Sequence, residues 1–214
     1  VERYIEMLAP RLQKEEYEQT IISSHSVNLD KLKESADNCY VTDMRQTFNP
    51  IAVMKIIRQV RKAIIASKPD IVYCHSSFAG VFGRLAAIGT HCKVVYNPHG
   101  WAFNMQQSIK KKKMYKWVEK ISAYFCNRIV CISDAEKTSA LREKICKPSK
   151  LQVIYNGIDF AELNREFKKT VDLSIPKNRN SVFHKLQVTG CDLLRLCLHI
   201  LTNPPFHRIR EAAC

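Results

Sequence analysis

Four short clusters of polar residues hold the side chains best suited to binding or chemistry. Each cluster follows a run of apolar residues: His75, Ser76 and Ser77 the first, His99 and Gly100 the second, Ser133 the third, Asn156 and Gly157 the fourth. An imidazole can donate or accept a hydrogen bond and titrates near neutral pH, and a serine hydroxyl can both donate and accept. If the clusters lie together, they form a site for a polar ligand, with the imidazole of His99 exposed on a His-Gly turn.

The clusters can meet only if the apolar runs are strands of one parallel sheet. We predict strands at residues 20–25, 39–42, 71–74, 93–96, 129–132 and 151–155, separated by stretches that mostly have helical spacing. Strands that alternate with helices form parallel sheets with right-handed connections, and ligands bind at the edge where such strands end. The predicted fold class is therefore α/β, a Rossmann-like parallel sheet with helices on both faces.

Helices are predicted at residues 1–12, 53–64, 78–88, 110–124 and 134–144. Pro10 should kink or end the first helix, because proline donates no backbone hydrogen bond. Gly80 and Gly83 should let the third helix approach the sheet closely, and Gly89 should end it. Ser133 begins a Ser-Asp-Ala-Glu sequence that is typical of a helix N-cap. A further helix-compatible run covers residues 191–201.

The composition is that of a soluble globular protein with excess positive charge. Its 34 Lys and Arg residues against 20 Asp and Glu residues give a net charge of +14, which favours anionic ligands or surfaces. The 9 cysteines form no C-x-x-C pair, and Cys74 and Cys131 lie in apolar runs, which indicates a reducing, cytoplasmic environment. No run approaches the roughly 18 apolar residues of a membrane-spanning helix. No His, Cys and carboxylate residues have metal-ligand spacing, so no metal is expected.

Four motifs follow one another along the chain, at Pro69–His75, Asn97–Gly100, Arg128–Ser133 and Val153–Asp159. Together they resemble the N-terminal, acceptor-side domain of the family 4 glycosyltransferases, which are retaining enzymes of the two-domain GT-B class. The resemblance implies one half of a GT-B fold. It also implies transfer of a sugar from a nucleotide-diphosphate sugar, a UDP- or GDP-sugar, without a metal ion. The acceptor it implies is a glycan or a lipid-linked molecule in polysaccharide, exopolysaccharide or glycolipid synthesis.

The same resemblance assigns roles to the four clusters. His99 is expected to contact the transferred sugar at the catalytic position, and Gly100 lets the backbone come close. The acceptor side is expected to include His75, Ser76, Ser77 and Ser133, and the hinge to a second domain matches Asn156 and Gly157. Each residue type also has a structural interpretation, because a histidine can satisfy a turn, a histidine or serine can cap a helix, and Asn-Gly can be an ordinary turn.

Three segments differ in their sequence pattern. Residues 1–159 have the Rossmann-like pattern but lack the first strand and glycine-rich loop of the family. We predict a hinge or linker at residues 160–180 and an irregular tail at residues 181–214. The paired glutamates of the family's donor domain have no counterpart after Asp159. We therefore expect a chain truncated at both ends, whose tail is either frameshifted or a remnant of the second domain. Such a fragment is expected to be inactive alone.

A basic helix is predicted where Lys110, Lys111, Lys112 and Lys113 precede Trp117. A solvated helix face is the ordinary interpretation. The alternative is adsorption to an anionic membrane, with the lysines at the head groups and the indole at the interface. That would place a cytoplasmic enzyme peripherally at the inner face of the plasma membrane. Nucleic acid is not expected as a partner, because no recognised binding motif accompanies the charge.

Two other functions stay open at this point. A stand-alone Rossmann-like binding module could use its basic surface on a membrane, a glycan or a partner chain. A sugar epimerase could use the same two-domain scaffold. The ordered motifs favour the transferase, because the hinge at Asn156 and Gly157 has a purpose only with a second domain.

Overall fold

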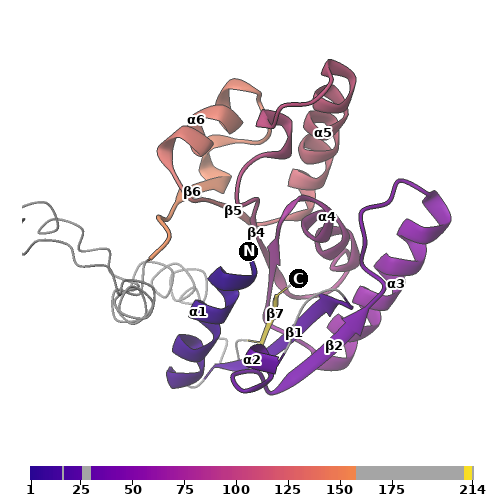
Figure 1. Cartoon of the computed structure of the whole chain (residues 1–214), viewed down its shortest axis with the longest axis vertical. Coiled ribbons are helices and arrows are strands. Elements are labelled where there is room, and N and C mark those ends of the chain that lie inside the picture. Colours follow the sequence, from indigo (N-terminus) through magenta and orange to yellow (C-terminus); the bar gives the residue numbers. More distant parts are fainter. Residues whose placement is uncertain (16, 26–29, 158–209, 214) are drawn as a thin grey trace, which may run out of the picture.

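Parallel strands form the centre of the molecule (Figure 1). The computed structural model describes residues 1–15, 17–25, 30–157 and 210–213. One sheet contains β2 (Asn38–Thr42), β1 (Glu18–Ser24) and β7 (Arg210–Ala213) in this order. The other contains β3 (Ile71–His75), β4 (Lys93–Asn97), β5 (Arg128–Cys131) and β6 (Leu151–Val153). The ladders between these strands are parallel, and β7 also lies beside β3, so the two sheets meet there.

Helices cover both faces of these sheets. α1 (Glu2–Lys14) and the short α2 (Asp30–Lys33) cover one face, where Tyr4 and Leu8 of α1 pack on the core. α3 (Pro50–Ser67), α4 (Ser77–Ala86), α5 (Ile109–Ser122) and α6 (Asp134–Arg142) belong to the other face, which holds the larger core. Short 3₁₀ turns lie at Ala102–Asn104, Ala123–Phe125 and Pro148–Lys150. The predicted α/β fold is confirmed.

Side chains of the buried strand β3 contribute to both cores. Ile71 and Tyr73 belong to the core under α1, whereas Val72 and Cys74 belong to the larger core on the opposite face. Successive side chains of a strand point to opposite faces, so a strand covered on both sides needs apolar residues throughout. His75 ends the strand on the α1 face, where its ring contacts Tyr4. The alternation thus brings an imidazole to the edge where the strands stop.

Gly80 lets α4 approach β4 closely, as predicted. A Cβ atom at this position would lie 2.3 Å from the Tyr96 ring, far inside van der Waals contact. Any other residue would push the helix away from the strand. The close approach therefore fixes the start of α4, with Ser77, beside the end of β4.

Burial keeps two cysteines away from solvent. Cys74 and Cys131 have no exposed surface, and burial raises the pKa of the Cys131 thiol to about 12. Both side chains therefore act as small apolar groups of the core.

The first helix differs from its prediction. α1 continues through Pro10 to Lys14, so the expectation that the helix could end at the proline is wrong, whereas the kink remains a prediction. Ala9 and Leu12 on this stretch are buried, and their packing offsets the backbone hydrogen bond that proline cannot donate. No helix in the described part of the chain is both long and apolar enough to cross a membrane.

A second difference is β7, which lies inside the segment 181–214 where an irregular tail is predicted. Its residues pair in register with Glu18–Ile21 of β1. The helix-compatible run 191–201 and the linker 160–180 fall outside the described residues, and the domain boundaries remain predictions.

Candidate active site

A left-handed turn follows β4 and carries His99 and Gly100. Their φ angles are 49° and 99°, and the first is in a region that residues other than glycine rarely adopt. The turn is held locally, because the backbone N–H of His99 donates to the side-chain oxygen of Asn97 at 3.0 Å. Asn97 is itself fully buried at the end of the strand. The strand end thus orients the imidazole predicted to be exposed there.

Glu136 fastens this turn to the next strand end. One carboxylate oxygen accepts from the backbone N–H of Gly100 at 2.6 Å, and the other accepts from that of Ile132 at 2.6 Å. Its backbone carbonyl accepts from the indole N–H of Trp101 at 2.9 Å. Burial raises the pKa of Glu136, while the two N–H groups favour the charged carboxylate. The turns after β4 and β5 are therefore joined by one buried carboxyl group.

The sequence alone does not predict that Glu136 joins the two turns. The Ser-Asp-Ala-Glu pattern does mark it as a helix N3 residue, from which a glutamate usually reaches back to the N-cap backbone. Here the carboxylate reaches one residue further, to Ile132, and across to Gly100. The second contact joins residues 36 positions apart, which no local pattern reveals.

His75 and His99 lie in hydrogen-bond contact. The Nδ1 atom of His75 is 2.9 Å from the Nε2 atom of His99, and the Tyr73 ring packs on His75 with its centroid 4.1 Å away. Burial, followed by the charge of His99, holds the pKa of His75 well below its usual range, and burial lowers the pKa of His99 to about 4. Both imidazoles are therefore neutral at pH 7, and one donates its hydrogen to the other.

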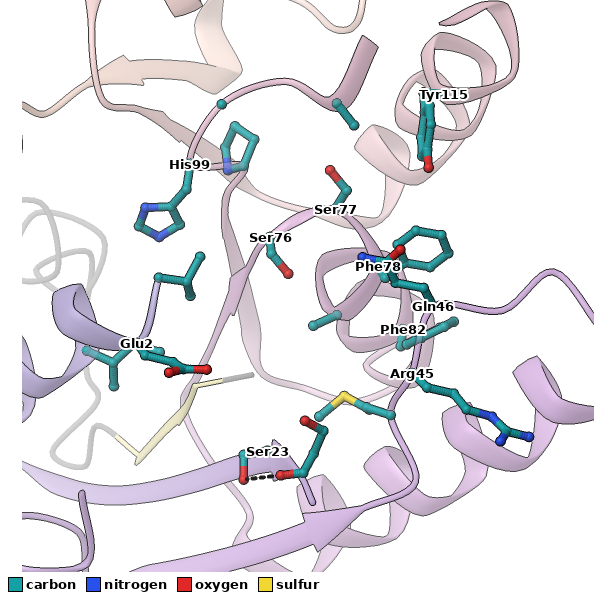
Figure 2. A pocket seen from close by; sticks show the side chains of 18 of the residues that line it. Glu2, Ser23, Arg45, Gln46, Ser76, Ser77, Phe78, Phe82, His99 and Tyr115 are labelled. Carbon is teal, nitrogen blue, oxygen red and sulfur yellow. Dashed lines mark hydrogen bonds between the residues drawn. The ribbon is translucent and has the colours of Figure 1, made fainter. Parts of the chain in front are cut away.

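A pocket of about 830 Å³ opens beside the His-Gly turn. Figure 2 shows His99 and Glu2 on one side of it, Ser76 and Ser77 between, and the aromatic side chains Phe78, Phe82 and Tyr115 opposite. The walls come from α1, the ends of β1 and β2, the start of α4, and α5. The pocket is therefore polar at one side and aromatic at the other.

Ser76 and Ser77 lie in this pocket at the start of α4. Ser76 occupies the N-cap position with a φ of 63°, but its hydroxyl makes no capping hydrogen bond, and its backbone N–H donates to the carbonyl of Asn97 at 3.1 Å. His75 is not among the residues that line the pocket, and it contacts His99 instead. The acceptor-side roles of these three residues remain predictions.

Ser133 lies in a second, neighbouring pocket of about 470 Å³. Its hydroxyl accepts from the backbone N–H of Glu136 at 3.2 Å, so the N-cap of α6 is confirmed. This pocket shares His99 and Gly100 with the larger one, which Ser133 does not line. The His-Gly turn is thus a wall common to both pockets.

The predicted hinge residues lie apart from both pockets. Asn156 and Gly157 are exposed after β6, at the end of the described range 30–157. Within the described ranges, no group of three or more His, Cys, Asp or Glu residues could hold a metal ion. The hinge and the metal-independent chemistry remain predictions.

The His-Gly turn lines two pockets at the carboxyl edge of a Rossmann-like sheet, as expected for the GT-B glycosyltransferases that the motifs resemble. Residues 1–162 match the model of Glycosyltransferase Family 4, and the chain belongs to this family. It is 33% identical over 151 residues to the UDP-Gal:alpha-D-GlcNAc-diphosphoundecaprenol alpha-1,3-galactosyltransferase of Escherichia coli. That match covers 69% of this chain and 39% of the relative, so the chain spans less than half of the relative's length.

Two solved structures share the fold. A glycosyltransferase from Rickettsia africae matches with a TM-score of 0.57 and 21% identity, over 98% of this chain and 56% of that one. HepE from Anabaena, solved in complex with UDP and glucose, matches with a TM-score of 0.53 and 18% identity, over 78% and 45% of the two chains. The family match favours the transferase over a stand-alone binding module.

Proposed function

We propose that this chain supplies the acceptor-side half of a retaining glycosyltransferase. The donor is a nucleotide-diphosphate sugar, either a UDP- or a GDP-sugar, and the acceptor is a glycan or a lipid-linked molecule. The observation that carries the proposal is the His99–Gly100 turn, which forms the wall between two pockets and is fixed by Asn97, Glu136 and His75. The name of the Escherichia coli relative, with UDP-Gal as donor and a diphosphoundecaprenol-linked acceptor, supports this choice of substrates.

The geometry suits the charge changes of such a transfer. Positive charge develops on the sugar and negative charge on the leaving phosphate, so a neutral hydrogen-bonding group at the sugar is preferable to a cation. Because burial lowers its pKa to about 4, His99 is such a neutral group at pH 7. Its Nε2 atom is engaged by His75, which leaves Nδ1 for a sugar hydroxyl. Fixed groups of this kind need no rearrangement during the reaction.

The basic helix α5 supports a peripheral membrane location at the inner face of the plasma membrane. Lys110, Lys113, Trp117, Lys120 and Tyr124 are exposed at helical spacing, on α5 and the turn that follows it. Trp117 is 65% exposed and Tyr124 is 82% exposed, which is high for side chains of this size. Lysines with interleaved aromatic side chains are typical of surfaces that bind anionic lipids. A lipid-linked acceptor would lie within reach of a domain bound in this way.

A chimera tests the proposed function. Residues 1–157 of this chain would replace the matching part of the Escherichia coli galactosyltransferase, and galactose transfer from UDP-Gal to GlcNAc-diphosphoundecaprenol would be measured. We expect transfer, and a loss of about 100-fold when His99→Ala is introduced, with UDP binding retained. His91→Ala, an exposed histidine away from both pockets, should keep full activity. A folded chimera that binds UDP and acceptor without transferring sugar would overturn the proposal.

A further inference from the structure

We propose that the aromatic side of the large pocket binds the apolar chain of a lipid-linked acceptor. Phe78, Phe82 and Tyr115 line this side of the pocket, and Phe48, which does not line it, packs against Phe78; these four side chains are called the aromatic wall. The identification of the ligand as an acceptor rests on the proposed function. The presence of a binding site for an apolar chain rests on the geometry of the wall.

The four rings form a continuous surface centred on Phe78. Its ring centroid lies 5.4 Å from that of Phe48, 6.3 Å from that of Phe82 and 6.4 Å from that of Tyr115. The rings come from the segment before α3, from α4 and from α5. Three elements far apart in sequence therefore converge on one apolar surface, part of which is seen at the right of Figure 2.

The aromatic wall leads from the interior to the surface. Phe82 is 2% exposed, Phe78 and Tyr115 are half-buried, and Phe48 is 63% exposed. Beyond Phe48, the first two turns of α3 expose Ile51 and Met54. Single exposed apolar side chains are ordinary, but these two closely follow Phe48, which packs on Phe78 of the pocket, and such a group of exposed apolar side chains is typical of binding grooves. A chain lying along this path would cover side chains that water now contacts.

The surroundings of the path fit a molecule that is polar at one end. Ser76 and Ser77 line the same pocket beside Phe78, and His99 lies on the opposite side, where the polar group of an acceptor would lie (Figure 2). Tyr115 is on α5, the helix that carries the lysine run Lys110–Lys113. These lysines complement a diphosphate group or an anionic membrane from which the chain would emerge. A free sugar acceptor would have no use for the exposed apolar side chains at this rim.

Farnesyl diphosphate is a suitable probe, because it has an apolar chain and a diphosphate but no sugar. Calorimetric titration of the chain, below the concentration at which the probe forms micelles, should give binding about 10-fold tighter than for inorganic pyrophosphate. Phe48→Ala and Phe78→Ala should each weaken farnesyl diphosphate binding about 5-fold or more and leave pyrophosphate binding unchanged. Ile65→Ala, which removes an exposed apolar side chain elsewhere on α3, is the matched control. Phe48→Ala changes a mostly exposed residue, so the fold is retained.

Dodecyl diphosphate separates the two possible sources of the chain. If farnesyl diphosphate binds more tightly than dodecyl diphosphate, the aromatic wall prefers isoprenoid chains. If the two bind equally, the wall also accepts straight alkyl chains. Both results support the inference. Equal affinity for farnesyl diphosphate and pyrophosphate, or binding that neither phenylalanine variant alters, would overturn it. The probe involves no sugar transfer, so an active chimera without farnesyl binding would refute only this inference. Farnesyl binding with an inactive chimera would refute only the proposed function.

Discussion

Glu136 accepts two short hydrogen bonds from the backbones of two separate turns. Gly100 and Ile132 donate to its two oxygens, each at 2.6 Å. A carboxylate suits this position because it only accepts, and both of its partners are N–H groups. His99, next to Gly100, is held in place by this bond and by Asn97. Glu136, which also lines the smaller pocket, therefore supports the site by fixing the backbone of the turn.

Replacing Glu136 with glutamine tests this support. The amide nitrogen cannot accept from one of the two N–H groups, so Glu136→Gln should lower the free energy of unfolding by about 1–3 kcal/mol. Urea denaturation monitored by circular dichroism provides the measurement. The exposed Glu34→Gln is the control and should have no effect. Equal stability of the Glu136→Gln variant and the wild type would show that the carboxylate is not needed.

The histidine pair makes the stability of the fold depend on pH. The pKa of His99 is lowered from 6.5 to about 4, and that of His75 is lowered as well, both mainly by burial. Between pH 6.5 and about pH 4, the unfolded chain therefore binds more protons than the folded chain. The free energy of unfolding should therefore rise with pH across this window and fall as the pH is lowered through it.

Urea denaturation at pH 7 and pH 5 measures this effect. His75→Phe removes the buried imidazole of the pair while keeping an aromatic ring, so the loss of stability at pH 5 should be smaller than in the wild type. The exposed His91→Asn should leave the loss unchanged. Carboxylates contribute equally in all three proteins and cancel in the comparison. An unchanged pH dependence in His75→Phe would contradict the assignment of a neutral pair.

Helices α4 and α5 and strand β4 are joined by a buried polar network. The Arg84 guanidinium donates to Glu119 at 2.9 Å, and the Tyr96 hydroxyl donates to the other carboxylate oxygen at 2.8 Å. The guanidinium also lies over the Tyr96 ring, 3.8 Å from its centroid. Arg84 and Glu119 are at most 1% exposed. The basic helix is therefore fixed to the element that begins with Ser76 and Ser77.

Removal of one partner should be costly at this depth. Arg84→Met leaves the Glu119 charge buried without its partner and should lower the free energy of unfolding by about 3–5 kcal/mol. The double variant Arg84→Met with Glu119→Met should lose less than the single one. Lys116→Met, which breaks the partly exposed pair of Lys116 with Glu143 at 2.7 Å, is the control and should cost about 1 kcal/mol or less. Similar losses from Arg84→Met and Lys116→Met would contradict this account.

The exposed lysines of α5 allow a test of membrane binding. Reversing the charge of Lys110 and Lys113 should weaken co-sedimentation with phosphatidylglycerol vesicles about 30-fold or more, because each lysine contributes about 1 kcal/mol near an anionic surface. Lys62→Glu with Lys93→Glu makes the same change of net charge at exposed positions outside α5. If both double variants bind equally, attraction depends on net charge alone and α5 is not a membrane surface.

Across the whole molecule, local sequence patterns predict the helices and strands but not the contacts between distant residues. The apolar runs that become β3 and β4 predict those strands, and the Ser-Asp-Ala-Glu sequence predicts the start of α6, because these signals lie within a few residues. The contact of His75 with His99 joins residues 24 positions apart, and that of Arg84 with Glu119 joins residues 35 positions apart. Neither has a local signal. The four rings of the aromatic wall are brought together in the same way, by the packing of distant elements.

The position of β7 is another consequence of non-local pairing. Arg-Glu-Ala-Ala has no strand-forming pattern, yet it pairs with β1 and lies beside β3. Glu211→Pro removes a backbone N–H within this strand and should lower the thermal midpoint by about 4 °C or more. Glu211→Thr keeps the N–H group and should leave the midpoint unchanged. Equal midpoints for both variants would show that the ladder contributes nothing to stability.

The two neutral imidazoles have one further consequence. A single hydrogen occupies the contact between Nδ1 of His75 and Nε2 of His99. If His75 supplies it, the Nδ1 atom of His99 carries a hydrogen and donates; if His99 supplies it, that atom accepts. A change of tautomer therefore reverses the hydrogen-bonding character of His99 while every heavy atom stays in place. One rigid turn can in this way meet a hydroxyl oxygen in one bound molecule and a hydroxyl hydrogen in another.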